Sequence, residues 1–155
     1  MRLKLFYLQY FKYYPTKRIG NYIYIDEARK EWAIPTSFFS KIKKVHKYSD
    51  IISFDLLEDG NSISSGGLGR AAVGGLLFGG VGAIVGAATG KHKTKSTCYK
   101  LQIKISVKDT SKPAEFITLL SSEAKRNSFL YKMAFKNAQE IMSMLEIMCN
   151  QKKHY

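Results

Sequence analysis

A glycine-rich segment at residues 66–90, with the sequence GGLGRAAVGGLLFGGVGAIVGAATG, constrains the fold of this chain more than any other feature. It holds ten of the twelve glycines, and residues 71–90 are twenty consecutive uncharged positions. As one helix these would extend about 30 Å, which matches the hydrocarbon thickness of a bilayer. Taken alone, the segment is a candidate for a membrane span.

Small residues recur at every fourth position of the segment, a spacing that lets helix backbones approach closely, as in a glycine zipper. One row consists of Gly67, Ala71, Gly75, Gly79, Ala83 and Ala87, and a second of Gly82, Gly86 and Gly90. The basic residues at the two ends are Arg70, Lys91, Lys93 and Lys95. We expect them to contact anionic lipid headgroups, at about 1 kcal/mol per residue.

The sequences on either side of the segment alternate as β-strands do. Residues 51–58 precede it, and apolar residues alternate with polar ones from Tyr99 to Val107 after it. If these strands pair, both ends of the segment leave the domain at one edge, and a single crossing would separate the strands. We therefore predict a helical hairpin with arms of ~15 Å, about half a bilayer, and expect lipid near Phe78 and Gly82 at its tip.

Two other interpretations of the segment stay open. The rows of small residues could pack against the protein's own surface or join copies into a homo-oligomer, with or without a membrane. Because glycine costs about 1 kcal/mol in a helix relative to alanine, the segment in water could also be a weakly ordered loop.

The remaining sequence indicates paired strands followed by one helix. Strands are expected at 22–26 and 31–34 as a hairpin, then at 43–48, 51–58, 99–107 and 114–120. From Ser128, an apolar stripe runs through Leu130, Ala134, Ala138, Ile141, Leu145 and Met148, and Ser128 or Asn127 is expected to be the N-cap. We expect Met133, Met142 and Met144 to be core residues too. We predict an α+β fold, a small antiparallel barrel or sandwich capped by the C-terminal helix, with the glycine-rich hairpin inserted between two strands.

Chain length and composition indicate one domain with an insertion and a short segment at each end. With 155 residues we expect one domain at 17–150, interrupted by an insertion at 60–97. A basic aromatic segment at 1–16 precedes it, and a basic tail at 151–155 follows. The first segment lacks the apolar stretch and the cleavage site of a signal peptide.

The order of these blocks resembles a family of Gram-positive bacterial and phage proteins. The blocks are RIGNYIYIDEARKEWAIP, YSDIISFDLLEDG, the glycine segment through KHKTK, CYKLQIKISV and NSFLYKMAFKNAQEIMSMLEIM. The resemblance covers about residues 17–149 and implies a bacterial pleckstrin-homology-like (PH-like, GRAM-like) domain interrupted by a glycine zipper. Many relatives continue into a helical SHOCT module, which we expect to be absent here. The family implies no particular activity.

Catalytic and metal-binding patterns are weak. His46, His92 and His154 are scattered, and neither Cys98 nor Cys149 has a partner at metal-ligand spacing. His46 and Asp50 are most simply a surface pair. GAATGKHKT has the wrong spacing for a phosphate-binding loop. We expect no enzyme, cofactor, metal or small-molecule substrate, and the two cysteines suit a reduced cytoplasmic protein.

A net charge of +13 favours an acidic partner. We expect a non-enzymatic membrane-associated module at the inner face of the cell membrane, anchored or oligomerised through the zipper hairpin. The alternative is a soluble basic module for nucleic acid or an acidic protein. Its contacts would be Lys100, Lys104 and Lys108 on one strand face, with Lys41, Lys43, Lys44 and Lys47.

Overall fold

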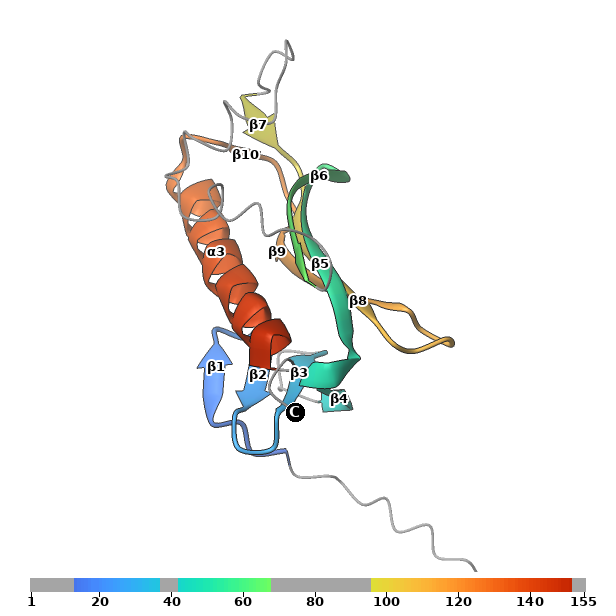
Figure 1. Cartoon of the computed structure of the whole chain (residues 1–155). Coiled ribbons are helices and arrows are strands. Elements are labelled where there is room, and N and C mark those ends of the chain that lie inside the picture. Colours follow the sequence, from blue (N-terminus) through green and yellow to red (C-terminus); the bar gives the residue numbers. More distant parts are fainter. Residues whose placement is uncertain (1–12, 37–41, 68–95, 152–155) are drawn as a thin grey trace, which may run out of the picture.

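The computed structural model describes residues 13–36, 42–67 and 96–151 as antiparallel strands and one long helix (Figure 1). The strands are β1 (Lys17–Ile19), β2 (Ile23–Asp26), β3 (Glu31–Pro35), β4 (Ile42–Lys47), β5 (Ile51–Glu58), β6 (Asn61–Gly67), β7 (Thr97–Cys98), β8 (Leu101–Val107), β9 (Ala114–Leu120) and β10 (Ala124–Lys125). A 3-10 turn, η1 (Tyr48–Asp50), joins β4 to β5, and helix α3 (Phe129–Asn150) follows β10.

The strands form three sheets, in which all pairs are antiparallel. Two sheets have four strands each, in the orders β1-β2-β3-β4 and β6-β5-β8-β9, and β10 pairs with β7 in a third. The hairpin expected at 22–34 is confirmed as β2 and β3. Its turn forms because Asp26 Oδ1 accepts hydrogen bonds from the backbone N–H groups of Ala28 and Arg29, both at 3.0 Å.

The pairing expected between the strands that flank the glycine segment is confirmed. β5 runs antiparallel to β8, with Phe54 opposite Ile105 and Glu58 opposite Leu101. The alternation of β8 arises because its apolar residues face the core, where Leu101, Ile103, Ile105 and Val107 are all buried. Tyr99 lies before this strand and is 55% exposed, so its assignment to the apolar face is wrong.

Helix α3 covers the β6-β5-β8-β9 sheet and contacts all four of its strands. It begins at one of the two expected residues, since the Ser128 side chain accepts a hydrogen bond from the Tyr131 backbone N–H at 3.3 Å. Most of the predicted apolar stripe is buried, from Ala134 to Met148. Leu130 and Met133 are exceptions, at 53% and 40% exposed. Tyr131, between them in sequence, is only 2% exposed, so Leu130 and Met133 lie on the uncovered side of the first turns of the helix.

These elements confirm the α+β class, mostly antiparallel sheets with one C-terminal helix. The described strands form separate sheets, so closure into a barrel is not seen among them. The predicted glycine-rich hairpin lies outside the described residues. β6 falls inside the 60–97 stretch that the sequence assigns to the insertion, and β7 begins at the last residue of that stretch.

Candidate functional site

The first junction of the glycine segment is the end of β6. Gly66 and Gly67 close this strand, opposite Phe54 and Ser53. A Cβ at Gly66 would lie 2.5 Å from the Phe54 ring, and one at Gly67 would lie 2.6 Å from Ser53 Cα. Gly67 also has a φ of +112°, which side-chain-bearing residues rarely adopt. Gly67, the first residue of the predicted zipper, is therefore needed for β6 to pass close to β5.

The two junctions lie at different ends of β5, contrary to the sequence-based expectation of one shared edge. Gly67 is opposite Ser53, whereas β7 precedes Leu101, which is opposite Glu58. The five steps from Ser53 to Glu58 along the strand span about 17 Å at ~3.3 Å per residue. The difference arises because β6 adds one strand that carries the chain back along β5. β7 leads directly into β8, which is in the same sheet as β6, so a single crossing would draw that sheet into the bilayer.

The second junction is held by β7 and β10. Cys98 pairs with Ala124, and the Arg126 backbone N–H donates to the Ser96 carbonyl at 3.0 Å. The chain thus returns from the glycine segment directly beside the start of α3, and Figure 1 shows β7, β10 and that end of the helix together.

A buried ion pair stabilises this junction. Arg126 Nη2 lies 2.9 Å from Glu58 Oε1, and the Glu58 side chain is only 6% exposed. Burial, with the charge of Glu58 adding to it, raises the pKa of the Cys98 thiol to about 12. Cys98 is therefore protonated at neutral pH and is not a nucleophile.

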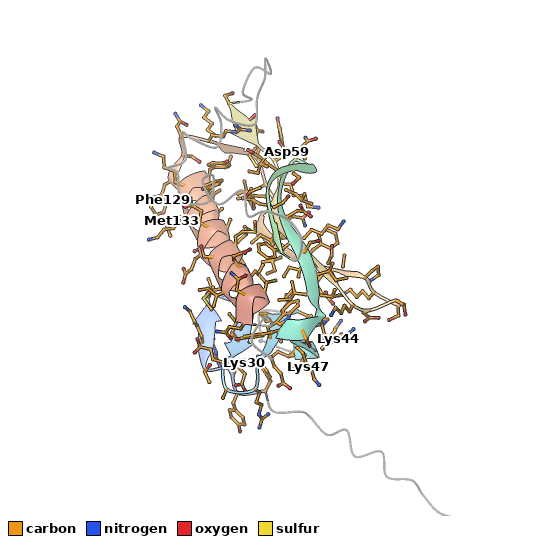
Figure 2. The ribbon with its side chains drawn as sticks, viewed as in Figure 1. Lys30, Lys44, Lys47, Asp59, Phe129 and Met133 are labelled. Carbon is orange, nitrogen blue, oxygen red and sulfur yellow. The ribbon has the colours of Figure 1, made fainter. Side chains whose placement is uncertain are left out.

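Asp59 fixes the backbone where the chain enters β8. It has a φ of +49°, and its Oδ1 accepts hydrogen bonds from the backbone N–H groups of Tyr99 and Lys100, both at 2.9 Å. Figure 2 shows Asp59 at the same end of the molecule as the start of α3. Its carboxylate ties the β5–β6 turn to the returning chain.

His46 is buried, so its interpretation as half of a surface pair with Asp50 is wrong. Only 4% of its side chain is exposed, its ring stacks on Trp32 at 4.5 Å, and Nε2 lies 3.3 Å from Glu115 Oε1. Lys112 Nζ contacts the other oxygen of Glu115 at 2.6 Å. Burial lowers the pKa of His46, and it outweighs the opposing effect of Glu115. We assign this group to the core. Among the described residues, no cluster of three or more metal-ligating side chains occurs.

The lysines of the predicted nucleic-acid surface do not form one uninterrupted basic face. Lys44 makes an ion pair with Asp109, which raises the pKa of Lys44 through their hydrogen bond. On β8, Lys104 is half-buried between its strand neighbours Asp55 and Phe116. Lys41 lies outside the described residues. Lys43, Lys47, Lys100 and Lys108 are exposed.

The other predicted zipper and headgroup residues lie outside the described residues. These are Ala71, Gly75, Phe78, Gly79, Gly82, Ala83, Gly86 and Gly90, with Arg70, Lys91, Lys93 and Lys95. Within the ranges 13–36, 42–67 and 96–151, no helix is both long and apolar enough to span a bilayer.

The antiparallel sheets, the C-terminal helix and the glycine segment between paired strands define a PH-like domain with an inserted zipper. The chain belongs to the family described as glycine zipper containing PH domain, whose model matches residues 11–121. The resemblance drawn from the sequence is thereby confirmed.

Two curated proteins resemble this chain at 24% identity over 131 residues, which is 79% of this chain. One is the "Immunity protein" of Bacillus phage SPbeta, and the other is the "SPbeta prophage-derived uncharacterized membrane protein YomJ" of Bacillus subtilis (strain 168). The matched parts are 59% and 52% of those proteins, so the chain spans a little over half their length. No solved structure matches.

Proposed function

We propose that this chain is a non-enzymatic, membrane-associated PH-like module at the inner face of the cell membrane, anchored or oligomerised through its glycine zipper. One observation carries the proposal: twenty consecutive uncharged residues, 71–90, lie between β6 and β8, two strands of a single sheet. An apolar stretch of this length is unusual in a surface loop and matches the hydrocarbon core of a bilayer.

The positions of the junctions favour a hairpin over a single span. One end of the segment follows β6, and the other leads through β7 into β8 of the same sheet, so the segment must return to the side it left. Two helical arms of about ten residues would each reach ~15 Å, and the small residues at every fourth position would let the arms pack closely. Arg70, Lys91, Lys93 and Lys95 would then lie at headgroup level.

Two further findings support a membrane role without enzymatic activity. The prophage relative is named a membrane protein, which makes a bilayer the first partner to test. His46 and Cys98, whose pKa values burial shifts, lie in the core and at a strand junction. The helix-capped sheets would serve as a platform that the hairpin holds at the membrane.

Cell fractionation of the full chain tests the anchor. In one variant, serine replaces the large apolar residues Leu76, Leu77, Phe78, Val81, Ile84 and Val85. In a matched variant, leucine replaces Gly75, Gly79, Gly82 and Gly86, which keeps the segment apolar but fills the zipper. We expect the natural chain and the leucine variant to stay with membranes through a high-salt wash, and the serine variant to become soluble.

Chemical cross-linking of the same three proteins tests the zipper. Loss of cross-linked oligomers in the leucine variant alone would assign oligomerisation to the small residues. If the natural chain is soluble at moderate salt, or if the serine variant remains with membranes, the anchor proposal is wrong.

A further inference from the structure

The first two turns of α3 carry an apolar patch that the fold leaves uncovered. Phe129 is 79% exposed, Leu130 53% and Met133 40%. The spacing of four residues places Phe129 and Met133 on the same side of the helix. Figure 2 shows both on the side of α3 that faces away from the sheets. Three adjacent exposed apolar side chains form a contiguous patch, which often marks an interaction site.

The patch adjoins the place where the glycine segment returns. The Ser96 carbonyl accepts a hydrogen bond from Arg126, three residues before Phe129. Tyr99, just after β7, is 55% exposed at this same end. An apolar surface and the point at which the chain returns from the glycine segment, Ser96, are therefore next to each other, although they are far apart in sequence.

The charges around the patch are mainly basic. Lys125, Lys132 and Lys136 are exposed near it, and the nearby exposed acids are Glu123 and Glu140. An apolar helix face bordered by lysines suits a bilayer surface that carries anionic headgroups.

The basic residues at the other end of the molecule cannot share this surface. Lys30 Nζ contacts Gln151 Oε1 at 2.9 Å, just past the last residue of α3. A helix of 22 residues places that end about 33 Å from the patch at ~1.5 Å per residue. Figure 2 shows Lys30, Lys44 and Lys47 far from Phe129. A flat membrane can touch only one of these two ends.

We propose that Phe129, Leu130 and Met133 form a second membrane contact, which enters the headgroup region of an anionic bilayer beside the glycine segment. The exposed Lys125, Lys132 and Lys136 contact the headgroup phosphates. This inference rests on the proposed membrane function and adds the orientation of the domain. The end with β7, β10 and the start of α3 faces the lipid, and the β1-β2-β3-β4 sheet faces away.

Vesicle flotation of the full chain tests the contact, with vesicles of phosphatidylcholine and phosphatidylglycerol. The test variant is F129S/M133S. The control variant, F116S/I147S, also removes two exposed apolar side chains, each 48% exposed. We expect binding to weaken on the order of tenfold in the test variant, because interfacial binding scales with buried apolar area, and to change little in the control. Circular dichroism checks that both variants fold.

The depth of position 129 in the bilayer provides a second test of the contact. Cys98 and Cys149 are both buried, so a cysteine placed at position 129 or 147 can be labelled selectively with an environment-sensitive dye. We expect brominated lipids to quench the dye at position 129 and not at position 147.

The outcomes separate the two proposals. If the natural chain does not float with vesicles, the membrane function and this inference are both wrong. If it floats, but F129S/M133S floats equally and the dye at 129 is not quenched, only the orientation is wrong. If the dye at 129 becomes shielded without vesicles as protein concentration rises, the patch is a contact between copies and the inference is overturned.

Discussion

Gly67 has a backbone conformation and a close contact that both require glycine. Its φ is +112°, and a Cβ there would lie 2.6 Å from Ser53 Cα and 2.7 Å from the Ile52 carbonyl oxygen. Both neighbours are backbone atoms, which cannot move aside as a flexible side chain can. We therefore expect Gly67→Ala to lower the free energy of unfolding by about 2–4 kcal/mol, measured by urea denaturation.

Gly60 provides the matched control. It also has a positive φ, +84°, but a Cβ there meets nothing within 4 Å. Gly60→Ala should therefore cost only about 1 kcal/mol, the backbone strain alone. Equal losses in the two variants would contradict the close approach of β6 to β5.

His46 should make stability depend on pH. Burial lowers its pKa below the ordinary value of 6.5, so the unfolded chain binds a proton at a higher pH than the folded chain does. The contribution is fully present above about pH 6.5 and is lost as pH falls toward the lower folded pKa. We expect the free energy of unfolding to decrease as pH falls below 6.5, measured by urea denaturation at several pH values.

His46→Phe is the test variant, because phenylalanine can keep the stacking on Trp32. It should reduce the pH dependence above pH 5.5, where carboxylates titrate little. An unchanged slope would mean that His46 has the same pKa in the folded and the unfolded chain, which contradicts the effect of burial.

Helix α3 depends on the cap at its first turn. The Ser128 side chain accepts the Tyr131 backbone N–H at 3.3 Å and satisfies one of the free donors at the helix start. Ser128→Ala should cost about 1 kcal/mol, and Ser128→Asp should restore stability, because it keeps the acceptor and adds a favourable charge. The midpoints of urea denaturation of the natural chain and the two variants measure these differences in stability. Equal midpoints for all three proteins would contradict the cap.

The junction at β7 depends on Asp59. Its Oδ1 accepts two backbone N–H groups, those of Tyr99 and Lys100, in a conformation with positive φ. Asparagine keeps an acceptor and tolerates this φ, whereas alanine does neither. Amide hydrogen exchange at Tyr99 and Lys100 should therefore be much faster in Asp59→Ala than in Asp59→Asn. Similar rates in the two variants would show that the carboxylate does not hold the returning chain.

The sequence predicts strands and a helix where apolar residues alternate or recur with a clear period. β5, β9 and most of β8 lie where their patterns place them, because each has one buried face. β6 is missed, since its sequence NSISSGG has a single large apolar residue, Ile63, and its pairing comes from backbone contacts with β5. The positive φ of Gly60 marks a hairpin turn, but glycine there also suits the start of an insertion.

Side-chain periodicity also fails to show where a covering surface ends. Leu130 belongs to the same helical stripe as Ala134, yet it is 53% exposed, whereas its neighbour Tyr131 is only 2% exposed. The burial of His46 was equally unpredictable, since it depends on Glu115 and Trp32, which reach it from other strands.

The proposed orientation at a membrane accounts for the positions of the glycine segment, the exposed patch of α3 and the sheet of β1 to β4. The glycine segment leaves from β6 and returns at β7, beside the exposed patch of α3, and the sheet of β1 to β4 lies toward the other end of the helix (Figure 1). The zipper hairpin would enter the bilayer, with the lysines near β7 and α3 at the headgroups. The remaining exposed surface would stay in water, free for a partner.

The depth of Phe78 tests whether the glycine segment enters lipid. Phe78→Cys can be labelled selectively in the full chain, because Cys98 and Cys149 are buried. In anionic vesicles we expect lipids brominated along the acyl chain to quench a dye at position 78, and to leave a dye at position 116 unaffected. No quenching at position 78, with the protein bound to the vesicles, would contradict insertion of the segment.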